Sequence, residues 1–164
     1  MKNKVLIGLG GNVGNVKNTL LKSIQLISTK IGPISQQSSI YKTAAWGIKD
    51  QAPFLNQALV LQTMLTPLQV LEHCLSIENE LGRDRINGKK WEERVIDIDL
   101  LFYNDQLIDL PQLQVPHPFV QDRNFVLIPL VEITPEFIHP TLHKTMLELA
   151  SISPDKMKVI KLLE

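Results

Sequence analysis

Two aspartates, Asp97 and Asp99, stand two residues apart where apolar and polar side chains alternate over residues 95–103. In a strand, such residues point the same way about 6.6 Å apart, so two carboxylates can converge on a hard cation. Magnesium prefers a few carboxylates, water and phosphate oxygens, so the pair favours magnesium-nucleotide chemistry. The alternative is an exposed strand face whose acids pair with nearby Arg and Lys. The opposite face is apolar and carries Ile96, Ile98, Leu100 and Phe102.

A basic segment precedes the two aspartates and contains Arg83, Arg85, Lys90 and Arg94. Its Asn87-Gly88 pair is typical of a loop. The guanidinium fork binds phosphate oxygens at two points, so this segment could clamp a polyphosphate as it meets the metal. The alternative is a solvated charged loop.

A third group of candidates follows the aspartates. His117 lies between Pro116 and Pro118, where it could donate to a phosphate, and Arg123 follows shortly after. Phe54, Trp46 and Phe125 lie near predicted loop ends, although for any single aromatic residue a place in the core is the more common role. The chain contains no Gly-x-x-x-x-Gly-Lys-Ser/Thr sequence, and its glycines at 8, 10 and 11 lack the spacing of a dinucleotide fingerprint. We therefore exclude both phosphate cradles and interpret residues 10–12 as a turn.

The elements that must position these residues follow from apolar periodicity and from breakers. Residues 5–9 predict a strand, and Asn15 predicts the start of a helix that Gly32-Pro33 stops. Residues 34–42 and 54–64 predict two further strands. Thr66-Pro67, with Gln69 at the third position, predicts a second helix that ends at Gly82 and buries Cys74.

The last part of the chain predicts strand 95–103, a turn at Asn104-Asp105 and a hairpin return at 107–108. The proline-rich tail predicts irregular segments and short helices over the core. The order strand, helix, strand, strand, helix, strand predicts an α+β, ferredoxin-like βαββαβ sandwich with an additional C-terminal hairpin and short helices. Two helices would cover one face of a mostly antiparallel sheet, and the other face would be left for a site.

Composition limits the partners. The 164 residues fit one domain, 1–164, and 17 Lys+Arg balance 17 Asp+Glu, so no global charge attracts nucleic acid or an acidic membrane. Cys74 is the single cysteine, which excludes a disulfide framework. No apolar run approaches the roughly 20 residues that span a bilayer, and residues 1–14 lack the features of a secretory signal. We expect a soluble, cytoplasmic protein, a monomer, whose partners are small molecules.

Taken together, these residues resemble the 6-hydroxymethyl-7,8-dihydropterin pyrophosphokinase family of the folate pathway. The resemblance covers residues 4 to about 140, and its most specific element is Arg94-x-x-Asp97-Ile98-Asp99. The other matching motifs are Gly-x-Gly-Gly-Asn at 8–12, Tyr41-Lys42-Thr43 with Trp46-Gly47, Phe54-Leu55-Asn56, Glu78 with Gly82-Arg83-x-Arg85, Val115-Pro116-His117 and Arg123-Asn124-Phe125. The resemblance implies transfer of pyrophosphate from ATP to the pterin hydroxymethyl group, which leaves AMP.

The resemblance also implies a role for each candidate. Asp97 and Asp99 would hold two Mg²⁺ ions that bridge the phosphates of ATP, and Arg85 and Arg94 would act with them in catalysis. The nucleotide would contact Glu78, Arg83, Arg85, Trp91, Arg94, Ile98, His117 and Arg123. The pterin would stack between Phe54 and Phe125, with its edge read by Asn12, Thr43, Ala44, Ala45, Trp46 and Asn56.

Two departures from the family pattern stand out. Glu92-Glu93 replaces a small Gly-Pro type pair before the signature arginine, and Gln112 stands where some members have an arginine facing the nucleotide. The sequence also allows two other functions: a non-catalytic small-molecule sensor, and a metal-dependent phosphohydrolase or nucleotidyltransferase that uses the same acids without a pterin. No residue is assigned as a general base.

Overall fold

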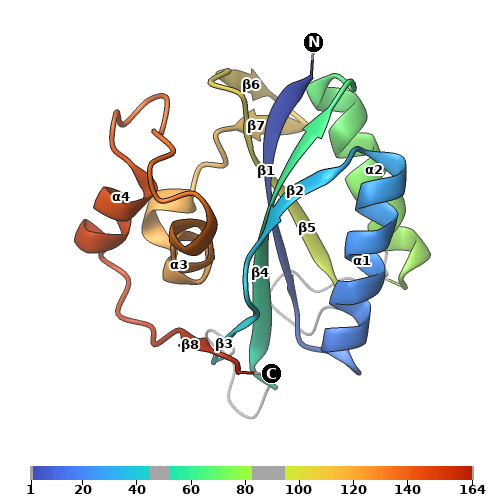
Figure 1. Ribbon diagram of the computed structural model, residues 1–164, viewed down its shortest axis with the longest axis horizontal. Helices are drawn as coiled ribbons and strands as arrows, with labels where there is room; N and C mark the ends of the chain where they lie inside the picture. The colour runs from blue at the N-terminus through green and yellow to red at the C-terminus, as the bar shows by residue number, and fades with distance from the viewer. Residues whose placement is uncertain (1, 45–51, 83–94, 164) are drawn as a thin grey trace.

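Six antiparallel strands form the central sheet of the computed structural model, which describes residues 2–44, 52–82 and 95–163. The sheet order is β5-β1-β4-β3-β8, and β2 pairs with β4 beside β3 (Figure 1). The strands are β1 (Asn3–Gly11), β2 (Ile34–Gln37), β3 (Tyr41–Thr43), β4 (Phe54–Thr63), β5 (Asp97–Tyr103) and β8 (Ile160–Lys161). The predicted ferredoxin-like α+β fold is confirmed, because β1 lies between β5 and β4 with helical crossovers.

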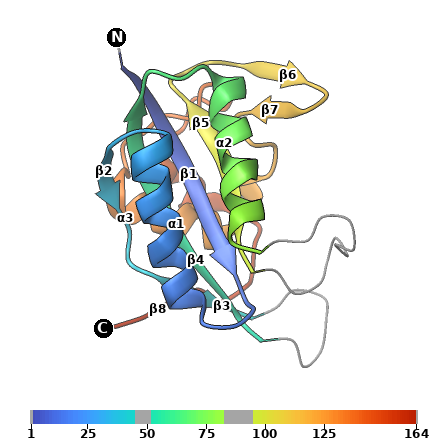
Figure 2. The same ribbon diagram turned by 90° about the vertical axis from the view of Figure 1, so that its right-hand side faces the viewer.

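Two helices, α1 (Val16–Lys30) and α2 (Pro67–Glu80), cover one face of this sheet (Figure 2). Both begin where the sequence predicts. The Asn15 side chain accepts from the Asn18 backbone N–H, and Thr66 forms a reciprocal capping box with Gln69. The chain leaves α1 through Gly32, where a Cβ would lie 1.9 Å from the Gln62 carbonyl oxygen. Only glycine permits this approach between the helix end and β4.

The larger core lies between these helices and the sheet. It contains alternate residues of β1, β4 and β5 because side chains two apart in a strand share a face. Cys74 is buried in it, as predicted. Its fully buried members include Val5, Ile7, Leu59, Leu61, Ile27, Val70, Ile77 and Ile96.

A second core covers part of the opposite face. Helices α3 (Asn124–Ile133) and α4 (Met146–Ile152), with the short 3-10 helix η1 (Val120–Asp122), pack there against the sheet. The buried residues are Leu6, Ala58, Val60, Leu101, Phe102, Val120, Leu127, Leu130, Met146 and Leu149. The face predicted to be left for a site is therefore partly covered, and the site must lie on the part that this core leaves open.

Four details of the sequence prediction are wrong. Residues 34–42 form two short strands, β2 and β3, rather than one. The hairpin joins β6 (Ile108–Leu110) to β7 (Leu113–Val115), so residues after Asn104 do not return along β5. Gly10 and Gly11 continue β1 and pair with β4, and the turn comes after them. The fourth wrong detail is the face of Phe102, which the alternation predicts beside Ile98 and Leu100.

Phe102 lies on the second face rather than with Ile98 and Leu100. A register shift between β1 and β5 pairs Leu6 with Phe102 but Ile7 with Leu100, so Phe102 joins Leu101 on the face of the second core. Such a bulge interrupts the two-residue alternation on which the prediction rests. Because the shift comes after Asp99, it leaves the predicted orientation of the two aspartates intact.

Candidate active site

The uncovered end of the second face forms the floor of a cavity of about 520 Å³. Across the strands, Gly8 pairs with Ala58 on one side and with Asp99 on the other. In the next row toward the strand end, Gly10 pairs with Asn56 and with Asp97. Gly8 and Gly10 therefore lie at the centres of these two rows, and the cavity lies over β1 between β4 and β5.

Gly10 is required by this arrangement. A Cβ built at Gly10 would lie 2.7 Å from the Asn56 Oδ1 atom. Asn56 is buried and donates through Nδ2 to the Thr43 Oγ1 atom at 3.2 Å. The missing side chain at Gly10 thus lets the Asn56 amide keep its place on the floor.

Asp97 and Asp99 both line the cavity from β5. The strand that carries them is tied to α2, because the Ile98 backbone N–H donates to the Glu78 carboxylate at 2.7 Å. Glu78 is 1% exposed and Ile98 is 4% exposed, with the Ile98 side chain in the larger core. Glu78 therefore fixes the backbone between the two aspartates from behind the site.

The wall opposite the sheet is built from the start of α3 and the residues before it. Phe125, Arg123 and Phe119 all line the cavity. The Arg123 Cζ atom lies 4.9 Å from the Phe119 ring centroid and 5.7 Å from the Phe125 ring centroid. These cation–π contacts orient the guanidinium between two rings at the cavity wall.

His117 adjoins this site without lining the cavity. Its backbone N–H donates to the Leu101 carbonyl at 2.9 Å, which places it beside β5. Burial, with the Arg123 charge, lowers the pKa of His117 to about 4, although Asp97 acts in the opposite direction. At neutral pH the ring is uncharged, and Nδ1 accepts from the Phe119 backbone N–H at 3.3 Å. The ring proton therefore sits on Nε2, which becomes a hydrogen-bond donor.

The predicted pterin-contacting residues divide into three groups. Phe54, Asn56, Thr43 and Ala44 line the same cavity as Asp97, Asp99, Arg123 and Phe125. Asn12 does not line it, and its Nδ2 donates to the Ala52 carbonyl at 3.0 Å. Ala45 and Trp46 lie outside the described part of the chain, as do four residues predicted to contact the nucleotide: Arg83, Arg85, Trp91 and Arg94.

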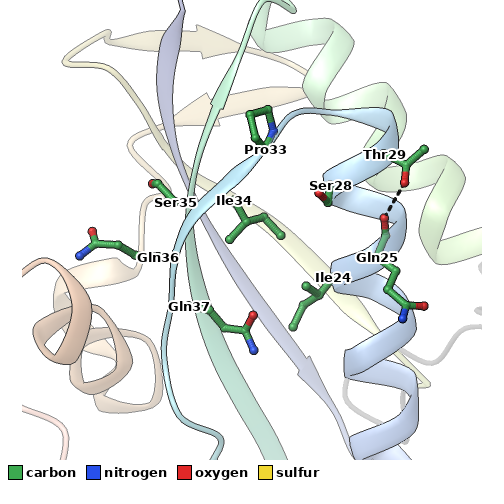
Figure 3. A pocket seen from close by; sticks show the side chains of 9 residues that line it. All are labelled: Ile24, Gln25, Ser28, Thr29, Pro33, Ile34, Ser35, Gln36 and Gln37. Carbon is green, nitrogen blue, oxygen red and sulfur yellow. Dashed lines mark hydrogen bonds between the residues drawn. The ribbon is translucent and has the colours of Figure 1, made fainter.

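A second hollow lies elsewhere, between α1 and β2 (Figure 3). Its walls carry the uncharged polar side chains Gln25, Ser28, Thr29, Ser35, Gln36 and Gln37, with Ile24, Pro33 and Ile34. None of these residues is charged, so the hollow offers no group that could neutralise a polyphosphate. The cavity over β1, with its aspartates and arginine, is the candidate active site.

Several residues that line the cavity were not predicted from the sequence. Phe119 precedes η1 and Asp122 ends it, and Asp155 and Met157 come from the C-terminal segment. Alternating Gly8 and Gly10 inside an apolar strand was the one available signal, since glycine in a strand often marks a close approach. Nothing in the local sequence marks Asp155 or Met157, because their place depends on tertiary packing.

Comparison with known proteins decides the family. Residues 6–135 match the model of the 7,8-dihydro-6-hydroxymethylpterin-pyrophosphokinase (HPPK) family. The chain belongs to this family. Its reaction is pyrophosphoryl transfer to hydroxymethyldihydropterin in folate biosynthesis.

Two curated relatives agree with this assignment, and both are named 2-amino-4-hydroxy-6-hydroxymethyldihydropteridine pyrophosphokinase. The protein of Aquifex aeolicus is 41% identical over 144 residues, which cover 88% of each chain. The protein of Bacillus subtilis is 42% identical over 134 residues, which cover 81% of this chain and 79% of the relative.

The fold also resembles the HPPK-DHPS protein of Plasmodium falciparum. The crystal structure of its wild type with pteroate superposes with a TM-score of 0.75 at 19% identity. The likeness covers 92% of this chain but 42% of that longer chain, and at this identity it concerns the fold alone. Among the described residues, no helix combines the length and the apolar character needed to cross a membrane.

Proposed function

We propose that this enzyme transfers the pyrophosphoryl group from Mg²⁺-ATP to the pterin hydroxymethyl group in the cavity over β1, and releases AMP. One observation carries the proposal. The predicted metal-binding acids, Asp97 and Asp99, and the predicted stacking pair, Phe54 and Phe125, line a single cavity. An acceptor held by the rings would therefore lie beside the acids that serve the donor.

The chemistry of the floor suits magnesium. Asp97 and Asp99 offer hard carboxylate oxygens on a rigid strand. Nowhere among the described residues, this cavity included, does a group of three or more His, Cys, Asp or Glu side chains stand ready to hold a metal, so other oxygens would have to complete the shell of an ion at this pair. Magnesium commonly takes one or two carboxylates and completes its shell with water and phosphate oxygens. We propose that this pair holds two Mg²⁺ ions, which would neutralise phosphate charge and polarise the β-phosphorus.

The pterin contacts follow from the cavity walls. A flat heteroaromatic ring stacks well between Phe54 and Phe125. Asn56 and Thr43, with the backbone near Ala44, supply hydrogen-bonding groups for its polar edge. We propose that Asn12 acts indirectly, by holding the chain at Ala52, and that Ala45 and Trp46 complete the edge.

The nucleotide contacts use the remaining candidates. We propose that Arg123 and the Nε2–H of His117 donate to ATP phosphates, because Arg123 lines the same cavity as the aspartates and the charge of Asp97 acts on the His117 ring. Glu78 and Ile98 would contribute by fixing the backbone of β5 rather than by direct contact. The other proposed nucleotide-binding residues are Arg83, Arg85, Trp91 and Arg94, with Arg85 and Arg94 stabilising the charge that rearranges during transfer.

The reaction needs few protein groups that take part directly in covalent chemistry. The hydroxymethyl oxygen attacks the β-phosphorus and releases its proton to water. The bond from this phosphorus to the α-phosphate bridging oxygen breaks, and AMP leaves with that oxygen. Catalysis then consists mainly of positioning and charge neutralisation, which the rings, cations and acids provide. We assign no general base, and uncharged His117 serves as a donor.

We further propose one catalytic domain over residues 1–164 that works as a cytoplasmic monomer. The balanced charge supports small-molecule partners over nucleic acid, and the lone buried Cys74 suits a reducing compartment. Sedimentation equilibrium should give the mass of a single 18.6 kDa chain. A dimer mass at enzyme concentrations used in assays would contradict the monomer.

Isothermal titration tests the proposed site. Hydroxymethyldihydropterin should bind more tightly when Mg²⁺ and a non-hydrolysable ATP analogue are present, and Phe125→Ala should weaken its binding by about tenfold. Leu107→Ala, at an exposed position away from the cavity, is the matched control. A phosphohydrolase would bind the nucleotide without pterin binding, and a sensor would bind pterin without any effect of Mg²⁺.

A further inference from the structure

The C-terminal segment runs beside the candidate active site although it lies far from the site in sequence. After α4, residues 153–159 return to the sheet, and β8 adds to the edge of β3 (Figure 1). The Leu162 backbone N–H donates to the Ile40 carbonyl at 2.9 Å. We call residues 153–163 the C-terminal strap. It lies beyond residue 135, where the family match ends.

The strap supplies part of the cavity wall. Asp155 and Met157 line the cavity together with Phe125 and Arg123. Inside the strap, the Asp155 backbone N–H donates to Ser153 Oγ at 3.2 Å, and Asp155 Oδ1 accepts from the Met157 backbone N–H at 2.8 Å. These bonds fix the bend that turns Asp155 toward α3.

Asp155 also holds the first residue of α3. Its Oδ2 atom accepts from the Asn124 backbone N–H at 2.8 Å, and its backbone carbonyl accepts from Asn124 Nδ2 at 3.1 Å. The first N–H groups of a helix lack partners within the helix, and Arg123 provides no side-chain cap for α3. A carboxylate is a favourable partner for a helix N-terminus. Asp155 therefore caps α3 from a distant part of the chain.

The capped residue lies between two site residues. Arg123 and Phe125 flank Asn124 directly, and both line the cavity. At the other end of the strap, Lys161 Nζ lies 3.4 Å from the Glu132 carboxylate near the C-terminus of α3. The strap thus contacts α3 at both of its ends and the sheet edge at β3.

We propose that the C-terminal strap positions α3 for substrate binding, and that Asp155 is the positioning residue that holds Phe125 and Arg123 at the cavity. Asp155 acts through the Asn124 backbone rather than on the reacting atoms. This inference rests on the proposed function of the cavity. It assigns a role in pterin affinity to a segment outside the residues that match the family.

Steady-state kinetics on the full chain tests the proposal. Asp155→Ala should raise the KM for the pterin by about tenfold, because loss of a helix cap lets the start of α3 move and the Phe125 ring with it. Asp155→Asn keeps one oxygen acceptor and should show a smaller increase. Asp105→Ala, which removes an exposed carboxylate in the turn after β5, should match the wild type.

Each result decides between positioning and a general structural role. A raised pterin KM in Asp155→Ala, partly restored in Asp155→Asn, supports the proposal. An unchanged KM with a lower kcat, in proportion to the folded fraction, would overturn it. If Asp155→Ala does not fold, Asp155→Asn decides, and a KM equal to that of Asp105→Ala would overturn the proposal. Absence of pyrophosphokinase activity in the wild type would instead contradict the proposed function.

Discussion

At the scale of single residues, the site places two acids on a strand opposite an arginine and two aromatic rings at the start of a helix. Asp97 and Asp99 are held by β5, whose backbone is fixed through Glu78, while Arg123 is oriented by Phe119 and Phe125. The acids and the cation belong to different elements. A polyphosphate in the cavity would therefore contact both.

The aspartates give the first prediction. Asp97→Asn and Asp99→Asn keep the side-chain shape but remove the charge that would bind Mg²⁺, so turnover should fall on the order of 10³-fold. Thermal midpoints in metal-free buffer should stay close to that of the wild type. Asp105→Asn is the control for removal of an exposed acid. Variants that retain most of their activity at saturating Mg²⁺ would contradict the metal assignment.

His117 gives the second prediction. Because burial and Arg123 lower its pKa, the ring of the ligand-free enzyme should titrate near pH 4, well below the usual 6.5. The unfolded chain takes up this proton at higher pH than the folded chain, so the stability contributed by neutral His117 is present above about pH 6.5 and falls toward pH 4. NMR titration of the His117 ring, assigned with His117→Gln, measures the midpoint. A midpoint near 6.5 would contradict the burial argument.

At the scale of elements, β1 forms the floor of the cavity with Gly8 and Gly10, which carry no side chains. Gly10→Ala should displace the Asn56 amide, because its Cβ would lie 2.7 Å from Asn56 Oδ1, and should weaken pterin binding by about tenfold. Gly8→Ala meets the flexible end of Leu101 at 3.3 Å and should have a smaller effect. Calorimetric titration of both variants ranks them. The reverse ranking would show that the Asn56 amide does not read the pterin.

Glu132 ties α3 to the edge of the sheet and gives a prediction about acid stability. Burial raises its pKa, but hydrogen bonds from Ser39, Tyr41 and Lys161 outweigh this effect and lower it. The resulting stabilisation is present above the unfolded carboxyl pKa and is lost as pH falls through the folded pKa. The free energy of unfolding, measured by urea titration, should therefore fall less between pH 7 and pH 3 in Glu132→Gln than in the wild type. Exposed Glu136→Gln should follow the wild type.

The elements also show what local patterns can predict. Strict alternation placed Asp97 and Asp99 on one face, and helix caps at Asn15 and Thr66 fixed both helix starts, because these signals depend on neighbouring residues. The bulge that turns Phe102 to the second face depends on pairing with β1, far away in sequence. Asp155 depends on a contact with Asn124, and no local pattern reports such a contact.

At the scale of the molecule, the two faces of the sheet have different roles. One face packs on α1 and α2 and supplies the larger core. The other face divides between a second core under α3 and α4 and the candidate active site. This division lets helix packing hold the site rigid while the site remains open to its substrates.

The identity of the nucleotide product tests the central claim most directly. The enzyme should be incubated with ATP, Mg²⁺ and 6-hydroxymethyl-7,8-dihydropterin, and the products separated by chromatography. Attack at the β-phosphorus predicts AMP and pterin diphosphate in equal amounts with negligible ADP. ADP as the main product, or AMP formed equally fast without the pterin, would contradict the account.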